Sequence, residues 1–194
     1  MPRSRVARIG LLVGGAALLV GSGRLAREEL TDEEVSTFRA LNEQSDAMRD
    51  AAWALMLGGT FGAVPAAAGL ALLTGHRRLA LELAVGGSAA YVLAKAVKPV
   101  VGRARPHGLL RDVRFRDEIG GNEGWISGHA AVSTSLALIA APELPRAGRV
   151  AAYGAAAGIG VSRLYAGAHM PLDVVGGAGL AMMIAALMPD PRRR

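Results

Sequence analysis

The segment SRLYAGAHMPLD, at 162–173, combines side chains that suit nucleophilic catalysis. His169 is followed four residues later by Asp173, a separation that places two side chains on one face of a helix. A carboxylate placed there accepts a hydrogen bond from one imidazole nitrogen and leaves the other nitrogen free to attack. Pro171 is compatible with the first turn of that helix. A single histidine near a helix start is more often structural, but Arg163, across a tight turn from His169, can reach the same ligand.

A basic segment, KPVVGRARP at 98–106, carries cations that suit phosphate binding. The planar fork of Arg105 matches phosphate oxygens, and Lys98 adds a compact point charge. Pro106 would end the preceding helix. The alternative is that Lys98, Arg103 and Arg105 form a positively charged membrane edge.

The segment ISGHA, at 126–130, has the pattern of a helix start with Ser127 as its cap. Free amide groups at a helix N-terminus bind anions, and Gly128 permits a close approach of the backbone. His129 then lies in the first turn, where it can face the bound group.

Metal binding is the rival use of two histidines and an aspartate. At least three basic side chains share the expected site, so a divalent cation would be repelled unless more carboxylates joined it. The acidic residues that could join it are in the intervening loop: Asp112, Asp117, Glu118 and Glu123. We therefore expect no metal and no other cofactor.

Long apolar segments predict the elements that position these residues. The chain of 194 residues is 52% hydrophobic but only 4% aromatic, and it contains 26 glycines, a composition that favours closely packed helices in lipid. We expect a single domain over residues 1–194 that is an all-α, polytopic transmembrane bundle of about six spans. Only the second of the six apolar segments reaches the roughly 20 residues that a bilayer requires. The segments are 9–23, 51–76, 83–97, 130–142, 150–162 and 174–189.

Alternation of the six segments across the membrane brings the reactive residues together. The end of the third segment, the start of the fourth, the end of the fifth and the start of the sixth must share one side. These four ends carry Lys98, His129, Arg163 and Asp173. Ionisable groups at membrane depth indicate a functional site, because exposure to lipid would cost several kcal/mol each.

Basic residues in short loops predict the orientation. Arginines in other loops weaken this signal, and the first segment could instead be a cleaved signal peptide. We interpret the side with the following residues as cytoplasmic, which places both termini there and the site outside: Arg3, Arg5, Arg8, Arg77, Arg78, Arg146, Arg149, Arg192, Arg193 and Arg194.

A surface helix is expected near residues 31–50. Thr31 and Glu34 have the spacing of a capping box. Val35, Phe38 and Leu41 then share one face, which could contact the membrane surface, although a plain solvated helix fits nearly as well.

Together the three segments resemble the signature of the type 2 phosphatidic acid phosphatase superfamily, which also contains the vanadium haloperoxidases. The family pattern is Lys, six residues, Arg-Pro; then Pro-Ser-Gly-His; then Ser-Arg, five residues, His, three residues, Asp. The chain reproduces this order, with Ile126 in place of the usual proline. The residues that match are Lys98, Arg105, Pro106, Ser127, Gly128, His129, Ser162, Arg163, His169 and Asp173.

The resemblance implies a role for each residue. His169 attacks phosphorus and forms a phosphohistidine, Asp173 orients His169, and His129 protonates the leaving group. The phosphoryl oxygens are held by Lys98, Arg105, Ser127, Gly128 and Arg163. The family implies no metal.

A membrane phosphatase or pyrophosphatase acting on a lipid phosphate at the extracytoplasmic face is therefore expected. The alternatives are an anion-binding or transport protein without hydrolysis, and a lipid phosphotransferase. The predominance of arginine over lysine hints at a bacterium and hence its plasma membrane. The absence of a basic stripe with interleaved aromatics gives no support to nucleic-acid binding, and the sequence leaves the particular lipid and the oligomeric state open.

Overall fold

The structure is a computed structural model that describes residues 4–117 and 121–189, and these residues form helices and loops without a named strand. The all-α prediction is confirmed. The helices are α1 (Arg5–Leu25), α2 (Asp32–Asn42), α3 (Arg49–Met56), α4 (Ala63–Leu73), α5 (Arg77–Val101), α6 (Pro106–Leu109), α7 (Gly128–Ala140), α8 (Arg146–Tyr165) and α9 (Pro171–Leu187), with short 3-10 turns η1 (Asp46–Met48), η2 (Leu57–Gly59) and η3 (Ala141–Glu143).

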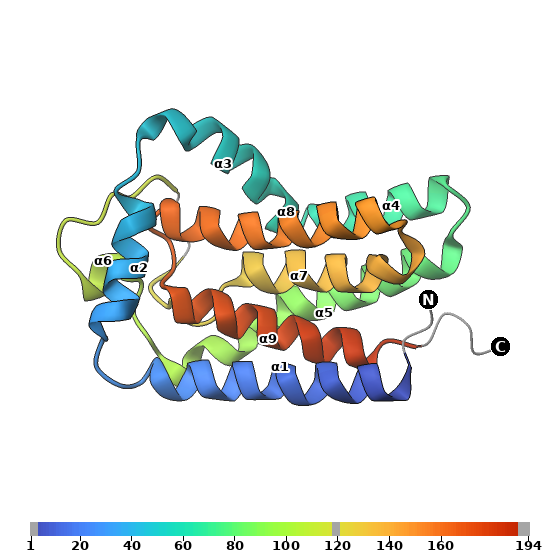
Figure 1. Ribbon diagram of the computed structural model, residues 1–194, viewed down its shortest axis with the longest axis horizontal. Helices are drawn as coiled ribbons and strands as arrows, with labels where there is room; N and C mark the ends of the chain where they lie inside the picture. Colours follow the sequence, from blue (N-terminus) through green and yellow to red (C-terminus); the bar gives the residue numbers. More distant parts are fainter. Residues whose placement is uncertain (1–3, 118–120, 190–194) are drawn as a thin grey trace.

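Helices α1, α4, α5, α7, α8 and α9 lie side by side along the long axis, and α2 lies across one end of this bundle (Figure 1). That end receives the end of α5, the start of α7, the end of α8 and the start of α9. These are the four ends that alternation of the apolar segments placed together. The site residues at those ends are therefore brought to one end of the molecule.

The opposite end of the bundle carries the basic residues used to predict orientation. There α1 and α8 begin, and α4 is joined to α5 (Figure 1). Arg8 Nε donates a hydrogen bond of 2.9 Å to the carbonyl of Ala186 near the end of α9. Arg77 and Arg78 begin α5. Arg3 and Arg192–Arg194 lie outside the described residues.

The outer surfaces of the helices are apolar, as expected for a protein in lipid. Val13 of α1, Leu81 and Val92 of α5 and Leu73 of α4 are exposed, the last at 88% of its surface. Such side chains gain nothing from water but are compatible with hydrocarbon, where backbone polar groups must be satisfied within helices. The chain is accordingly a membrane protein.

Within residues 4–117 and 121–189, two helices, α1 and α5, are long and apolar enough to cross a membrane, and the bent pair 46–59 and 63–73 would make a third span. The other long helices do not meet that standard by length and composition. The number of six spans therefore remains a prediction.

The segment 51–76, expected as one long span, is instead broken. Its two helical parts meet at an angle of 69°. Three glycines, Gly58, Gly59 and Gly62, surround the break, and glycine is a poor residue for a helix interior. A Cβ atom on Gly59 would lie 2.9 Å from Cβ of His129, so the break brings the chain unusually close to the site.

Glycines also allow α1 and α9 to approach closely. A Cβ atom on Gly15 would lie 2.6 Å from the carbonyl oxygen of Gly179, and one on Gly179 would lie 2.8 Å from that of Gly15. Small residues at such crossings allow backbone contact. Ser22 of α1 also accepts a hydrogen bond of 3.3 Å from Trp125 Nε1, so α1 is packed into the bundle.

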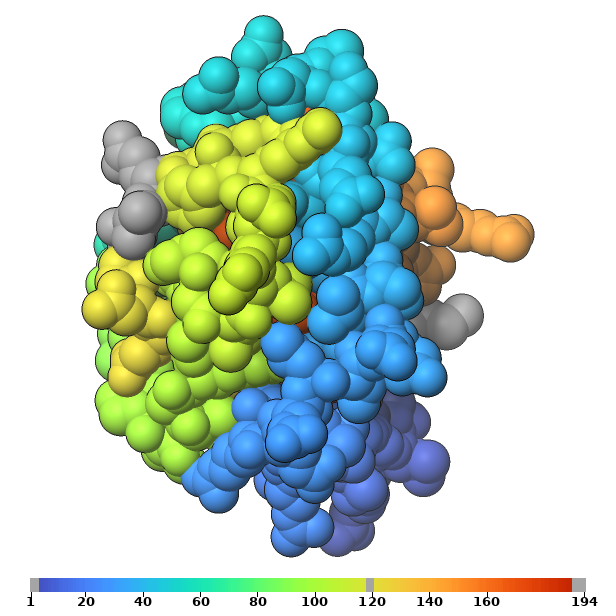
Figure 2. Space-filling model, turned by 90° about the vertical axis from the view of Figure 1, so that its left-hand side faces the viewer, coloured from blue at the N-terminus to red at the C-terminus, as the bar shows by residue number. Residues whose placement is uncertain are grey.

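Helix α2 confirms the expected surface helix but ends at Asn42. The Thr31 side chain accepts a hydrogen bond from the Glu34 amide, which is one half of the predicted capping box. At Phe38 the apolar face packs on protein, since Phe38 is 1% exposed and contacts Leu164 and Met170, whereas Val35 and Leu41 remain partly exposed. Figure 2 shows α2 and the loop after α5 covering this end of the bundle.

Candidate active site

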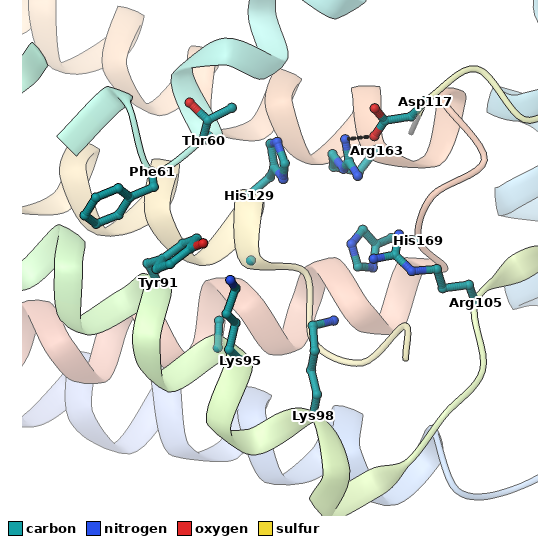
Figure 3. Close-up of a pocket in the computed structure, with 13 residues that line it drawn as sticks. Thr60, Phe61, Tyr91, Lys95, Lys98, Arg105, Asp117, His129, Arg163 and His169 are labelled. Carbon is teal, nitrogen blue, oxygen red and sulfur yellow. Dashed lines mark hydrogen bonds and ion pairs between the residues drawn. The ribbon is translucent and has the colours of Figure 1, made fainter. Parts of the chain in front are cut away.

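A cavity of about 430 Å³ lies between the second half of α5, the start of α7, the end of α8 and the break before α4. Six of the eight predicted site residues line it: Lys98, Arg105, Gly128, His129, Arg163 and His169 (Figure 3). They come from α5, the loop after it, α7, α8 and the loop before α9. The structure therefore brings together side chains that are far apart in the sequence.

His169 and Asp173 form the closest pair in this group. His169 Nδ1 lies 3.3 Å from Asp173 Oδ2, and both side chains are buried. A carboxylate only accepts hydrogen bonds, so this contact requires the proton on Nδ1 and leaves Nε2 with a free lone pair. The pair thus has the arrangement that a nucleophilic imidazole needs.

His169 and Asp173 do not share one face of a helix, in contrast to the prediction from their spacing. His169 lies in the loop before α9, and Asp173 is in the first turn of that helix, where its Oδ2 also accepts a 2.8 Å hydrogen bond from the Met170 amide. The contact therefore arises from capping of α9. Pro171 occupies the first turn, as predicted.

Burial lowers the pKa of His169 from its usual 6.5 to about 4, against the opposing effect of Asp173, which raises it. Arg163 and Lys98 lower the pKa further. His169 is consequently neutral at pH 7, and the neutral imidazole is the form that can attack.

A tight turn between α8 and α9 sets the distance between Arg163 and His169. The amides of Ala168 and His169 both donate to the Arg163 carbonyl, at 3.0 and 3.3 Å. Gly167 has a φ of 73°, and a Cβ atom there would lie 2.5 Å from the carbonyl oxygen of Arg114. Glycine is therefore needed at this turn.

His129 reaches the cavity from the first turn of α7. Ser127 caps that helix, and its side chain accepts a hydrogen bond from the Ala130 amide at 3.4 Å. Gly128 lines the cavity, whereas Ser127 is fully buried and is not among the lining residues. Ile126, in the position of the family proline, is also fully buried.

The cations are held in place by several partners. Lys98 Nζ donates to the carbonyls of Glu123 and Gly124, at 2.9 and 3.2 Å, and Arg105 Nη1 donates to that of Ala168 at 3.2 Å. Arg163 Nη1 pairs with Asp117 Oδ2 at 2.5 Å. The buried Nε of Arg163 has no hydrogen-bond partner among the described residues.

Arg103 does not line the cavity, in contrast to the grouping of three cations considered from the sequence. Its two terminal guanidinium nitrogens donate to Glu34, at 2.9 and 2.5 Å, and its Nη1 also lies 3.4 Å from Asp173 Oδ1. Burial alone would lower the pKa of Arg103, but hydrogen bonding to Glu34 and the charges of both acids raise it overall. The guanidinium is therefore firmly charged.

Several lining residues were not predicted from the sequence: Gly59, Thr60, Phe61, Tyr91 and Lys95. Tyr91 and Lys95 precede Lys98 on α5 by about two turns and one turn, so helical periodicity could have identified them. The others enter because the chain breaks between α3 and α4. Glu34 was identified only as a capping residue.

No group of three or more acidic or histidine side chains is arranged to bind a metal within residues 4–117 and 121–189. Of the four acids considered as ligands, Asp117 is paired with Arg163, Asp112 is exposed, and the backbone carbonyl of Glu123 binds Lys98. Glu118 lies outside the described residues.

Fold and cavity together define a helical membrane protein with a His–Asp pair surrounded by fixed cations. The sequence profile of the PAP2 superfamily matches residues 77–190. The chain therefore belongs to the PAP2 superfamily, the family that its three segments resemble, and it is a phosphoric ester hydrolase.

Two solved structures are similar to this fold. LpxE of Aquifex aeolicus is 23% identical, with a TM-score of 0.71 over 82% of this chain and 95% of the other. A transmembrane PAP2-type phosphatidylglycerolphosphate phosphatase from Bacillus subtilis is 18% identical, with a TM-score of 0.65 over 92% and 93% of the respective chains. No curated protein sequence matches the chain.

Proposed function

We propose that this protein hydrolyses a phosphomonoester or pyrophosphate group of a membrane lipid through a phosphohistidine on His169. The observation that carries the proposal is the contact between His169 Nδ1 and Asp173 Oδ2 beside a cluster of cations in one cavity. One of the two similar structures is that of a transmembrane phosphatidylglycerolphosphate phosphatase, which supports a lipid phosphate as the substrate.

In the first step Nε2 of His169 attacks phosphorus. A nitrogen–phosphorus bond forms, the bond from phosphorus to the leaving oxygen breaks, and protonated His129 donates a proton to that oxygen. Burial and Arg163 lower the pKa of His129 to about 3, and the negative charge of a bound phosphate raises it, so His129 takes up its proton together with the substrate. Asp173 stabilises the positive charge that develops on the ring of His169. In the second step water attacks phosphorus, His129 takes a proton from it, and phosphate leaves His169.

The cations act mainly by position. Lys98, Arg105 and Arg163 place fixed positive charge around the cavity, and the amide of Gly128 at the start of α7 adds a donor. Phosphoryl transfer depends chiefly on such positioning and on electrostatic stabilisation of the equatorial oxygens. Ser127 contributes by capping α7 rather than by lining the cavity.

The basic end of the bundle supports a cytoplasmic location for both termini, which places the cavity toward the extracytoplasmic face of a bacterial plasma membrane. Fusion of a reporter to either terminus, with accessibility measured from each side in intact cells, tests this orientation. A reporter exposed outside would contradict it.

The decisive test is phosphate release by purified protein in detergent from four substrates: phosphatidic acid, phosphatidylglycerophosphate, a polyprenyl pyrophosphate and a polyprenyl sugar phosphate. We expect turnover of at least one without added metal, and none with His169→Ala. Full activity of that variant, or complete loss of wild-type turnover with a chelator, would contradict the mechanism. Binding of phosphate without any turnover would favour the transport alternative, and transfer to an added alcohol would indicate a phosphotransferase.

A further inference from the structure

Glu34 is a buried acid in a helix that lies outside the segment matched by the superfamily profile. Its side chain is 7% exposed, and its two oxygens bind the two terminal nitrogens of Arg103. Its Oε1 also accepts a 3.2 Å hydrogen bond from the amide of Leu172, in the first turn of α9. A buried carboxylate with three such hydrogen bonds has a defined position.

Arg103 connects this acid to the proposed nucleophile. Its Nη1 lies 2.9 Å from Glu34 Oε1 and 3.4 Å from Asp173 Oδ1. The other oxygen of Asp173 lies 3.3 Å from His169 Nδ1. The four side chains therefore form a continuous series, Glu34–Arg103–Asp173–His169, in which the two oxygens of Asp173 have separate partners.

The face of α2 that carries Glu34 also holds both ends of the loop containing His169. Phe38, one turn after Glu34, packs against Met170, directly after His169. Asn42, a further turn along, donates from Nδ2 to the carbonyl of Tyr165 at 3.0 Å. Residues four apart share a helical face, so one surface of α2 contacts the loop at its start, its end and the helix that follows.

We propose that Glu34 is a positioning residue for the reaction, which acts through Arg103 on Asp173. The inference rests on the proposed function, because Glu34 can position the reaction only if His169 is the nucleophile. With Glu34 present, the guanidinium is shared between two carboxylates, and Asp173 Oδ2 is left to orient the imidazole. Without it, Arg103 is free to bind both oxygens of Asp173, which weakens the hydrogen bond to His169 and the stabilisation of its developing charge.

The test is Glu34→Gln, with Glu33→Gln as the matched control. Glu33 is the neighbouring, exposed acid in the first turn of the same helix. We expect kcat of Glu34→Gln to fall by about 10- to 100-fold, as for small displacements of a reacting group. KM and the inhibition constant for inorganic phosphate should change by less than about twofold, because the cations that line the cavity are untouched. The control should retain wild-type kcat.

Two outcomes would overturn the inference. One is wild-type kcat in Glu34→Gln. The other is a proportional loss of kcat and of phosphate affinity, which would indicate that the substitution disturbs the structure of the whole site. If Glu34→Gln does not fold, Arg103→Lys replaces it. That variant keeps the charge but lacks the fork that reaches both acids, so the same selective loss of kcat is expected, and normal kcat would overturn the inference.

A measurement that needs no turnover separates this inference from the proposed function. In protein labelled with ¹⁵N-histidine, the His169 signals are assigned by their loss in His169→Ala. Glu34→Gln should shift them and Glu33→Gln should not. Inactivity of the wild type on all four lipids would contradict the proposed function alone, whereas unchanged His169 signals in Glu34→Gln would contradict the positioning role alone.

Discussion

Arg163 and Asp117 form an ion pair of 2.5 Å at the cavity that also contains His169. Both residues line that cavity (Figure 3). The carboxylate of Asp117 therefore occupies the guanidinium that a phosphate bound in the cavity would also bind. An anionic substrate must therefore compete with an acid supplied by the protein.

Replacement of this acid should strengthen phosphate binding. In Asp117→Asn we expect the inhibition constant of inorganic phosphate to fall by about 3- to 10-fold, because a competing negative charge is removed from Arg163. The measurement is competitive inhibition of lipid dephosphorylation. Asp112→Asn is the matched control, since Asp112 is exposed in the same loop and asparagine tolerates its φ of 58°. Weaker phosphate binding in Asp117→Asn would show that Asp117 helps to bind the anion.

Asp173→Asn should remove most activity, and it should also lower the Tm, because an NH2 group in place of Oδ2 cannot accept the hydrogen bond of the Met170 amide. The amide can donate to Nδ1 and stabilise the wrong tautomer of His169, so we expect kcat to fall by about three to four orders of magnitude. Phosphate release under saturating substrate gives kcat, and thermal unfolding in detergent reports on the fold. Activity within tenfold of wild type would show that this contact does not set the tautomer.

The pH dependence of stability should report on His169. Its pKa of about 4 in the folded protein lies below the usual 6.5, because burial penalises the imidazolium. The unfolded chain therefore binds this proton at a higher pH than the folded protein, and lowering the pH from 6.5 to about 4 favours unfolding.

We expect the Tm in detergent to fall across that interval, and to fall less in His169→Gln, which cannot take up the proton. Because other groups also titrate there, the comparison is the difference between the two proteins. An identical fall in both would indicate that His169 is not buried in its neutral form.

The glycine break before α4 should be needed for catalysis. A Cβ atom on Gly59 would meet His129 Cβ and Ile159 Cγ2, each at 2.9 Å, so Gly59→Ala should displace His129 and lower kcat at least about tenfold. Gly58→Ala is the control, since its Cβ would meet only the flexible end of Ile159, at 3.1 Å. Equal activity of the two variants would show that His129 does not depend on this close approach.

Much of the site could be predicted because its residues sit at the ends of apolar segments. Alternation of those segments was enough to place Lys98, His129, Arg163 and Asp173 at one end of the bundle, whatever the exact span boundaries. The spacing of His169 and Asp173 also predicted their contact, although capping of α9 and not a shared helical face produces it.

Other features depend on contacts between segments that one sequence does not reveal. The pairing of Glu34 with Arg103 joins residues 69 positions apart, and the capping-box spacing that distinguishes Glu34 from Glu33 does not indicate this partner. The break at Gly59 lies within a run whose hydropathy predicts a continuous span. Likewise, nothing in the sequence distinguishes Gly15 and Gly179, where α1 and α9 cross closely, from the many other glycines.

The most direct test of the central claim is to trap the covalent intermediate. Purified protein is mixed briefly with a lipid that it hydrolyses and that carries a label in its reactive phosphoryl group. The protein is then denatured at alkaline pH, which preserves phosphohistidine, and digested for mass spectrometry. We predict label on His169, no label in His169→Ala, and loss of the label after brief acid treatment. Rapid turnover with label on another residue, or undiminished label in His169→Ala, would contradict His169 as the nucleophile.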